Sequence, residues 1–261
     1  MAGEEPVEYP LALRLLDHQI EAPDSTPLAN VDDIELELND TELHATALLC
    51  GPAALGERLP GRLGSWTLAV WRRITLDPYP APIRIPLTEV QEITSAVRLT
   101  PQAAGVVQRR LTLEAWLRQH LINKIPGSGA EPSPPAEPRQ RSAPAVEALE
   151  AGTITVRLSA LLGYAAYSGT AGLGQVHEVT ALQTRPSAPI VGRMPVNGYV
   201  IGPRNTGTTL GYDRHPEHGP RLLRAGILAL HRHDVTIAAA DVTELDPVHR
   251  RITVGRPPAE R

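Results

Sequence analysis

The sequence predicts a mainly β protein with helical inserts (α+β class), in which two small β-barrels are joined by a proline-rich linker. Three observations support this prediction: an internal repeat, short segments that alternate apolar and polar residues, and one long segment without large apolar side chains. Hydrophobic residues make up 42% of the chain, which is enough for real cores, but aromatic residues make up only 3%. We therefore expect Leu, Val, Ile and Ala to fill the cores.

The linker is the clearest feature of the organisation. Residues 126–144 read PGSGAEPSPPAEPRQRSAP and contain no large apolar side chain. Such a segment cannot bury enough surface to offset the entropy of ordering it. We therefore expect a disordered, flexible linker at 126–150, between a first domain at 10–125 and a second domain at 151–257.

Three stretches of the first block recur in the second block in the same order. LLDHQIEAPDSTPLANVDDIEL parallels LLGYAAYSGTAGLGQVHEVTAL, and EVQEI at 89–93 parallels DVTEL at 241–245. Between these stretches lie matched glycine–proline elements: Gly51, Pro52 and Gly56 in the first copy, and Gly202, Pro203 and Gly207 in the second. The shared order and spacing indicate two copies of one domain.

The strands of each copy carry a shared irregularity. Residues 34–38 read IELEL, which predicts a strand with one buried face and one solvated face. Val31 is out of phase with Ile34, and Val176 is out of phase with Val179. One extra residue at the same place in both copies predicts a β-bulge, which bends a sheet toward closure.

The glycine–proline elements predict barrel corners. Proline cannot donate to a strand ladder, so Pro52 and Pro203 mark strand ends. The glycines beside them permit sharp bends, and Gly56 and Gly207 would permit a second bend. Helical inserts are expected at 65–74 and 220–233, and an extra helix at 101–123 with Thr100 as its N-cap.

These features together resemble the PRC-barrel family, and most closely its two-barrel versions in actinobacteria. The resemblance is carried by LLDHQIEAPDSTPLANVDDIEL and RLSALLGYAAYSGTAGLGQVHEV. In that family the barrel is a non-enzymatic module that docks on another macromolecule, as in the photosynthetic reaction-centre H subunit and a ribosome maturation factor. The resemblance therefore implies an adaptor that docks on a protein partner, with the cytoplasmic face of a membrane protein as one candidate.

The bulges supply the strongest polar candidates for a binding site: Asp32, Asp33, His177 and Glu178. Carboxylates and imidazole suit divalent metals, and the same groups could contact a partner. The alternative interpretation is that they are solvated residues on a bulge. We predict no catalytic residue, no metal site and no cofactor.

Other candidates for chemistry are weaker. The late histidines, His215, His218, His231 and His233, could hold zinc, but they lack a cysteine and an HEXXH motif. GTAGLG at 169–174 does not match a phosphate-binding loop and is predicted to be a hairpin. Cys50 matches Ile201 in the other copy, so we expect a small buried hydrophobe.

Charge and targeting signals set the remaining expectations. The net charge of −4 disfavours general affinity for nucleic acid. Basic residues and tryptophans of the first block keep RNA or ribosome association open as the alternative function: Arg72, Arg73, Arg109, Arg110, Arg118, Trp66, Trp71 and Trp116. A single cysteine, no signal peptide and no membrane-spanning run predict a cytoplasmic protein. Whether the barrels pair within the chain, and the oligomeric state, stay open.

Overall fold

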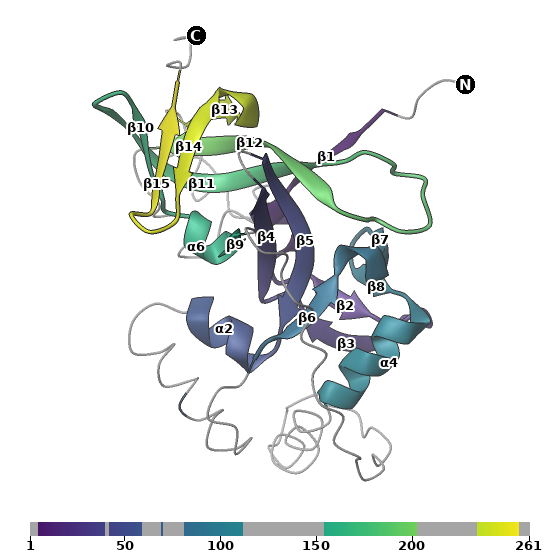
Figure 1. Cartoon of the computed structure of the whole chain (residues 1–261). Coiled ribbons are helices and arrows are strands. Elements are labelled where there is room, and N and C mark those ends of the chain that lie inside the picture. Colours follow the sequence, from purple (N-terminus) through teal and green to yellow (C-terminus); the bar gives the residue numbers. More distant parts are fainter. Residues whose placement is uncertain are drawn as a thin grey trace, which may run out of the picture.

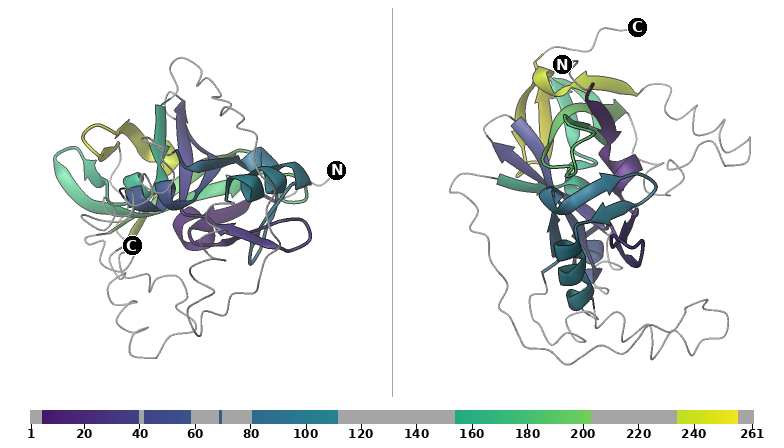
Figure 2. Two further views of the ribbon diagram at one scale, coloured as in Figure 1. Left: turned by 90° about the horizontal axis from the view of Figure 1, so that it is seen from below. Right: turned by 90° about the vertical axis from the view of Figure 1, so that its right-hand side faces the viewer.

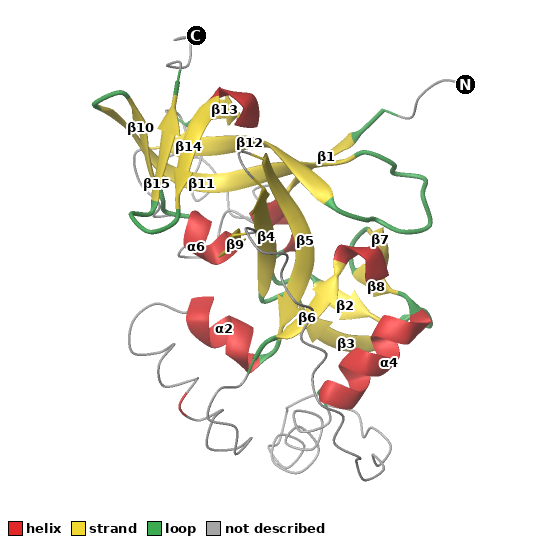
Figure 3. Ribbon diagram, viewed as in Figure 1, coloured by secondary structure: helices red, strands yellow, loops and turns green. Residues whose placement is uncertain are grey.

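The computed structural model describes residues 5–39, 42–58, 69, 81–111, 154–202 and 234–255. Within these ranges the fold is mainly β with a few short helices, as predicted (Figures 1 and 3). Eleven of the described strands form a curled half-barrel sheet, and four form a second, small sheet. Figures 1 and 2 show β10, β11, β12 and β15 at one end, β2, β3, β8 and α4 at the other, and β4 and β5 between them.

The first repeat contains eight strands, three α-helices and one short 3₁₀ helix within the described residues. In chain order they are β1 Val7–Pro10, α1 Leu11–Leu15, β2 Gln19–Glu21, β3 Pro27–Asn30, β4 Asp33–Asn39, β5 Glu42–Cys50, α2 Pro52–Arg58, β6 Ile83–Pro86, η1 Leu87–Glu89, β7 Val90–Ile93, β8 Val97–Leu99 and α4 Pro101–Arg110.

The second repeat follows the same order from its first strand to its last. Its elements are β9 Ile154–Arg157, α6 Leu158–Leu161, β10 Ala165–Ser168, β11 Ala171–Gln183, β12 Met194–Gly202, β13 Val235–Ala238, η4 Ala239–Asp241, β14 Val242–Asp246 and β15 Arg251–Val254. The pairing also repeats: β2 runs parallel to β8, and β10 runs parallel to β15. The internal repeat found in the sequence is therefore a structural repeat.

The predicted bulge is present in the second repeat, whereas the first repeat has a break in the strand at the same place. In the second repeat the register of β11 against β12 shifts between Val176 and Glu178, so His177 is the extra residue. In the first repeat the strand is interrupted at the same place, because β3 ends at Asn30 and β4 begins at Asp33. β3 belongs to the small sheet and β4 to the large one, so the irregularity lets the chain change direction between sheets.

The first strand of each repeat pairs with the other repeat. β1 lies antiparallel to β11, with Tyr9 opposite Ala181, and β9 lies antiparallel to β4, with Val156 opposite Leu36. β1 and β9 hold the same place in the repeat, as do β4 and the second half of β11. The exchange is therefore reciprocal, as in a domain-swapped dimer, although both partners belong to one chain.

The centre of this arrangement lies between β5 and β12, which join the two repeats in one sheet. Pro195 lies opposite His44. When Gly51 is aligned with Gly202, Pro195 is also the counterpart of His44. The two strands therefore meet at equivalent positions, which places a local pseudo-two-fold axis at this pair, as in a symmetric homodimer.

One continuous core spans both repeats. Leu11 and Leu15 of α1 and Leu158 and Leu161 of α6 are 0% exposed. Each such side chain gains roughly 1.5–3 kcal/mol from burial before conformational entropy is counted. Because α1 packs on β11 and α6 packs on β4, this gain couples the two repeats.

The predicted helices are only partly covered by the described residues. α4 begins at Pro101, and the side chain of Thr100 accepts a hydrogen bond from the Ala103 N–H, as predicted for its N-cap. The inserts expected at 65–74 and 220–233, the end of the helix expected at 101–123 and the linker at 126–150 lie outside the described residues, apart from Ala69. No helix in the described part of the chain has the length and apolar character needed to cross a membrane.

Candidate functional site at the junction of the repeats

The carboxylates at the bulges hold the exchanged helices. Asp33, at the start of β4, is 0% exposed. Its Oδ1 accepts a hydrogen bond from the backbone N–H of Ser159 at 3.0 Å, and its Oδ2 accepts one from the Ser159 hydroxyl. Ser159 is the second residue of α6, whose own N-cap residue provides no side-chain bond. Asp33 therefore satisfies a helix N–H that would otherwise lack an intrahelical partner.

Glu178 plays the same part for α1. Its Oε1 accepts a hydrogen bond from the Ala12 N–H at 2.7 Å, and its Oε2 accepts one from the Leu13 N–H at 2.8 Å. Burial raises the pKa of Glu178, while backbone hydrogen bonds from Ala12, Val179 and Leu13 act in the opposite direction. Because Glu178 is the counterpart of Asp33, each repeat caps the first helix of the other.

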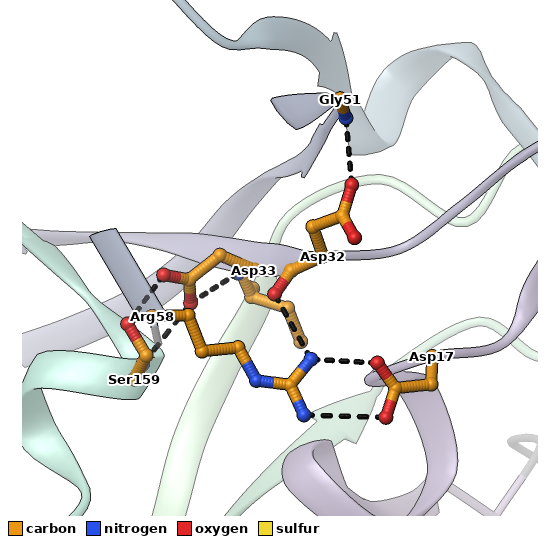
Figure 4. A network of polar contacts seen from close by, with 7 residues as sticks. Asp17, Asp32, Asp33, Gly51, Arg58 and Ser159 are labelled. Atoms are coloured by element: carbon orange, nitrogen blue, oxygen red, sulfur yellow. Dashed lines mark hydrogen bonds and ion pairs between the residues drawn. The ribbon is translucent and has the colours of Figure 1, made fainter. Parts of the chain in front are cut away.

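Asp32, Arg58 and Asp17 form a polar network beside Asp33 (Figure 4). Oδ2 of Asp32 accepts a hydrogen bond from the Gly51 N–H at 2.6 Å. Arg58 donates to both carboxylate oxygens of Asp17, at 2.6 and 3.2 Å, and to the backbone carbonyl of Asp32 at 3.2 Å. The side chains of Arg58 and Asp17 are 19% and 36% exposed, so water partly screens the pair. The network ties the end of α2 to the junction of β3 and β4.

His177 is the counterpart of Asp32 and is 5% exposed. Its Nδ1 lies 3.6 Å from Oδ2 of Asp234, whose side chain is 11% exposed. A Cβ at Gly202 would lie 2.0 Å from Oδ1 of Asp234 and 2.8 Å from Cε1 of His177, so the close approach requires glycine. The bulge residues of the two repeats thus make contacts at separate places. Asp33 and Glu178 each cap a helix of the other repeat, whereas Asp32 and His177 contact residues of their own repeat.

The glycine–proline elements agree only in part with the prediction of barrel corners. Gly51 has a φ of +96°, which favours glycine, and it turns the chain from β5 into α2, where Pro52 is the first residue. The prediction that Gly56 bends the chain is wrong, because Gly56 lies inside α2. Gly202 is the last residue of β12. Outside the described residues lie Pro203 and Gly207.

The sequence does not predict the charged cluster that forms on the Glu35 and Glu37 face of β4. Alternation predicts a solvated face for Glu35 and Glu37, but Glu37 is only 6% exposed. Nε of Arg84 lies 2.7 Å from Oε1 of Glu35, and its Nη2 lies 3.6 Å from Oε1 of Glu37. Nη2 of Arg193, on the loop after β11, lies 2.6 Å from Oε2 of Glu37. The cluster therefore joins residues of both repeats.

The described ranges contain no group of three or more His, Cys, Asp or Glu side chains that could hold a metal. Cys50 is fully buried, as predicted. Arg109 and Arg110 are exposed in the last turn of α4. The other residues considered for zinc or RNA lie outside the described residues: His215, His218, His231, His233, Arg72, Arg73, Arg118, Trp66, Trp71 and Trp116.

The polar groups at the junction join carboxylates to backbone N–H groups and to arginines. Such contacts fix the relative position of helices and strands. Comparison of the sequence with protein-family models gave no match, and comparison with curated proteins gave none.

Proposed function

We propose that each repeat is a PRC-type barrel and that the chain is a non-catalytic adaptor that docks on a protein partner. The strand order supports the first part of this proposal. The second repeat follows the order β13-β12-β11-β10-β15-β14, and the first repeat follows β6-β5-β4 and then β3-β2-β8-β7. Short strands in one repeated order, with bulges at matching places, suit a small barrel.

The reciprocal exchange of β1 and β9 is the observation that carries the adaptor function. It makes the two repeats one body, since each helix cap and each first strand depends on the other repeat. The carboxylates at the junction are occupied by contacts within the chain. A body whose junction carboxylates are engaged within the chain suits recognition through its outer surface.

On the basis of the resemblance to PRC-barrel domains, we place this docking in the cytoplasm. The cytoplasmic face of a membrane protein is one candidate partner. The function needs no cofactor, because the proposed role is recognition and no bond is made or broken.

Affinity capture from the native host, with the membrane fraction retained, tests the adaptor function. We expect one protein to be enriched, and purified samples of that protein and this chain should then form a complex on size-exclusion chromatography. Turnover of a substrate by the purified chain, or failure of every enriched protein to form a complex, would contradict the proposal.

RNA binding is the second candidate, and the exposed pair Arg109 and Arg110 favours it. We expect RNA affinity that falls as salt rises, and loss of binding when both arginines are replaced by glutamate. Gln102→Glu, on the exposed first turn of the same helix, is the matched control. No RNA shift at low salt would remove this candidate.

A further inference from the structure

An extended loop of the second repeat covers one edge of the first. The loop at 184–193 joins β11 to β12 and descends beside β7 (Figure 1). The Val191 N–H donates to the carbonyl of Val90 at 2.8 Å, and the Gly192 N–H donates to the carbonyl of Leu87 at 3.2 Å. Val191 itself is 6% exposed. The loop segment runs antiparallel to residues 87–90, because its first donor, Val191, meets the later acceptor, and its second donor meets the earlier one.

The same edge of the second repeat is partly exposed. Leu87 and Val90 are 0% exposed and Ile93 is 9% exposed. Their counterparts in the second repeat are only partly buried: Ala239, Val242 and Leu245. We name these three residues the β14 edge, since β14 is the terminal strand of the large sheet in its pairing order.

The difference follows from loop length. The connection between β4 and β5 is the counterpart of the loop at 184–193, but it consists of only two residues, 40–41. The Ala239 carbonyl accepts a bond from the Val242 N–H, as the Leu87 carbonyl does from the Val90 N–H. Among the backbone bonds of the described residues that lie outside helices and strand ladders, none ends on the carbonyl of Ala239 or Val242 in the way that Val191 and Gly192 bind the first repeat. The β14 edge therefore offers the two acceptor positions that Leu87 and Val90 use in the first repeat.

We propose that the β14 edge docks an extended segment of a protein partner, in the position that Val191 and Gly192 hold on the first repeat. The segment would present an aliphatic residue, two successive N–H donors and a basic residue after them. Addition of an extended segment to a sheet edge is a common mode of peptide recognition. Asp241 and Glu244 are exposed on this edge, and their negative charge favours a segment that carries a basic residue. This inference rests on the proposed adaptor function.

A synthetic peptide with the sequence of residues 186–194 (PSAPIVGRM), labelled with fluorescein, is the probe. Titration with the full chain should give saturable binding with one site per chain, because the loop already fills the edge of the first repeat. A peptide with Val191→Asp should not bind. Failure of the unmodified peptide to bind overturns the proposal, and this is the result expected if another part of this chain covers the β14 edge.

Variants of the full chain locate the site. Val242→Arg should weaken peptide affinity by about tenfold or more, which corresponds to about 1.4 kcal/mol. Val248→Arg, at a residue 84% exposed in the turn between β14 and β15, is the matched control and should bind normally. Ala239→Arg provides a second test if Val242→Arg lowers the unfolding temperature. Unchanged binding by folded variants of the β14 edge overturns the proposal.

The outcomes separate this surface from the wider function. If a captured partner binds the wild type and Val242→Arg equally, the adaptor function stands and the β14 edge is not its surface. If the peptide binds at the β14 edge but no partner forms a complex, the surface stands and the adaptor function fails.

Discussion

Asp33 of β4 accepts two hydrogen bonds from Ser159 of α6, although 126 residues separate them along the chain. The relationship is matched in the other direction by Glu178, which binds two N–H groups of α1. The two acids therefore do more than cap helices. Each acid connects its own repeat to the first helix of the other repeat.

Asp33→Ala should lower the free energy of unfolding by about 1–3 kcal/mol, because it leaves the N–H and hydroxyl of Ser159 without their acceptor in a partly buried place. Urea denaturation followed by circular dichroism measures the change. Glu8→Ala, at an exposed position of β1, is the control and should change stability by less than about 0.5 kcal/mol. Equal stability of Asp33→Ala and the wild type would show that the bonds are not needed.

Glu178 should make stability depend on pH. Burial raises its pKa in the folded chain above the ordinary value of 4.5, so the folded chain holds the proton more tightly than the unfolded chain. The free energy of unfolding should therefore fall as pH rises from 4.5 through the folded pKa, and the contribution should be constant above it.

Glu178→Gln removes this titration and isolates its effect. Urea denaturation of the wild type and the variant in buffers from about pH 4 upward gives the difference in stability. We expect the wild type to lose stability relative to the variant as pH rises through the window. A difference that rises with pH would mean that the hydrogen bonds to the carboxylate outweigh its burial.

The reciprocal exchange predicts that the repeats stay together without a covalent link. A specific protease site inserted within 126–150 would allow the folded chain to be cut. After cleavage, the two fragments should elute as one complex with an unchanged circular dichroism spectrum, since β1 and β9 remain paired with the other repeat. Separation into two folded monomers would be incompatible with the exchange.

Two glycines should respond in opposite ways to alanine. Gly51→Ala should cost about 1–2 kcal/mol, because φ is +96° there, although the nearest atom to the added Cβ lies 4.0 Å away. Gly105→Ala, inside α4, should raise the free energy of unfolding by about 0.5–1 kcal/mol. The new Cβ meets only the flexible end of Arg109, at 3.4 Å. Thermal unfolding of both variants tests the contrast, and a stable Gly51→Ala would argue against the left-handed turn.

The charged cluster around Glu37 predicts that removal of an acid and removal of a base change the free energy of unfolding by different amounts. Glu37→Leu should change stability by less than about 1 kcal/mol, because Arg193 is exposed and Arg84 keeps its contact with Glu35. Arg84→Leu removes a positive charge that pairs with Glu35 and Glu37. It should lower the free energy of unfolding by about 1–3 kcal/mol, toward the lower end because the site is partly exposed. Chemical denaturation measures both, and an equal cost would contradict the arrangement.

The sequence predicts much of the local structure. Repeated apolar patterns locate the strands, the phase change at Val31 and Val176 locates the bulge, and Thr100 locates the start of α4. These features depend on neighbouring residues, so a single chain is enough to identify them. The match of Cys50 to Ile201 in the other copy predicts its burial, which the structure confirms.

The connections between repeats could not be predicted in this way. Alternation shows which face of a strand is buried, but it does not show which strand lies beside it. Alternation therefore does not predict the partner of Asp33 or the ion pair between Arg193 and Glu37. Gly56 was misassigned because glycine is compatible with both a bend and a short helix whose first residue is proline.

The pairing of His44 with Pro195 has a consequence for stoichiometry. A dimer of identical subunits would present every surface twice, related by its rotation axis. In this chain the two halves differ, and the longer loop of the second half covers the edge of the first half that is equivalent to the β14 edge. If the β14 edge binds a partner segment as proposed, we expect one molecule to bind one ligand there, where a symmetric dimer would bind two.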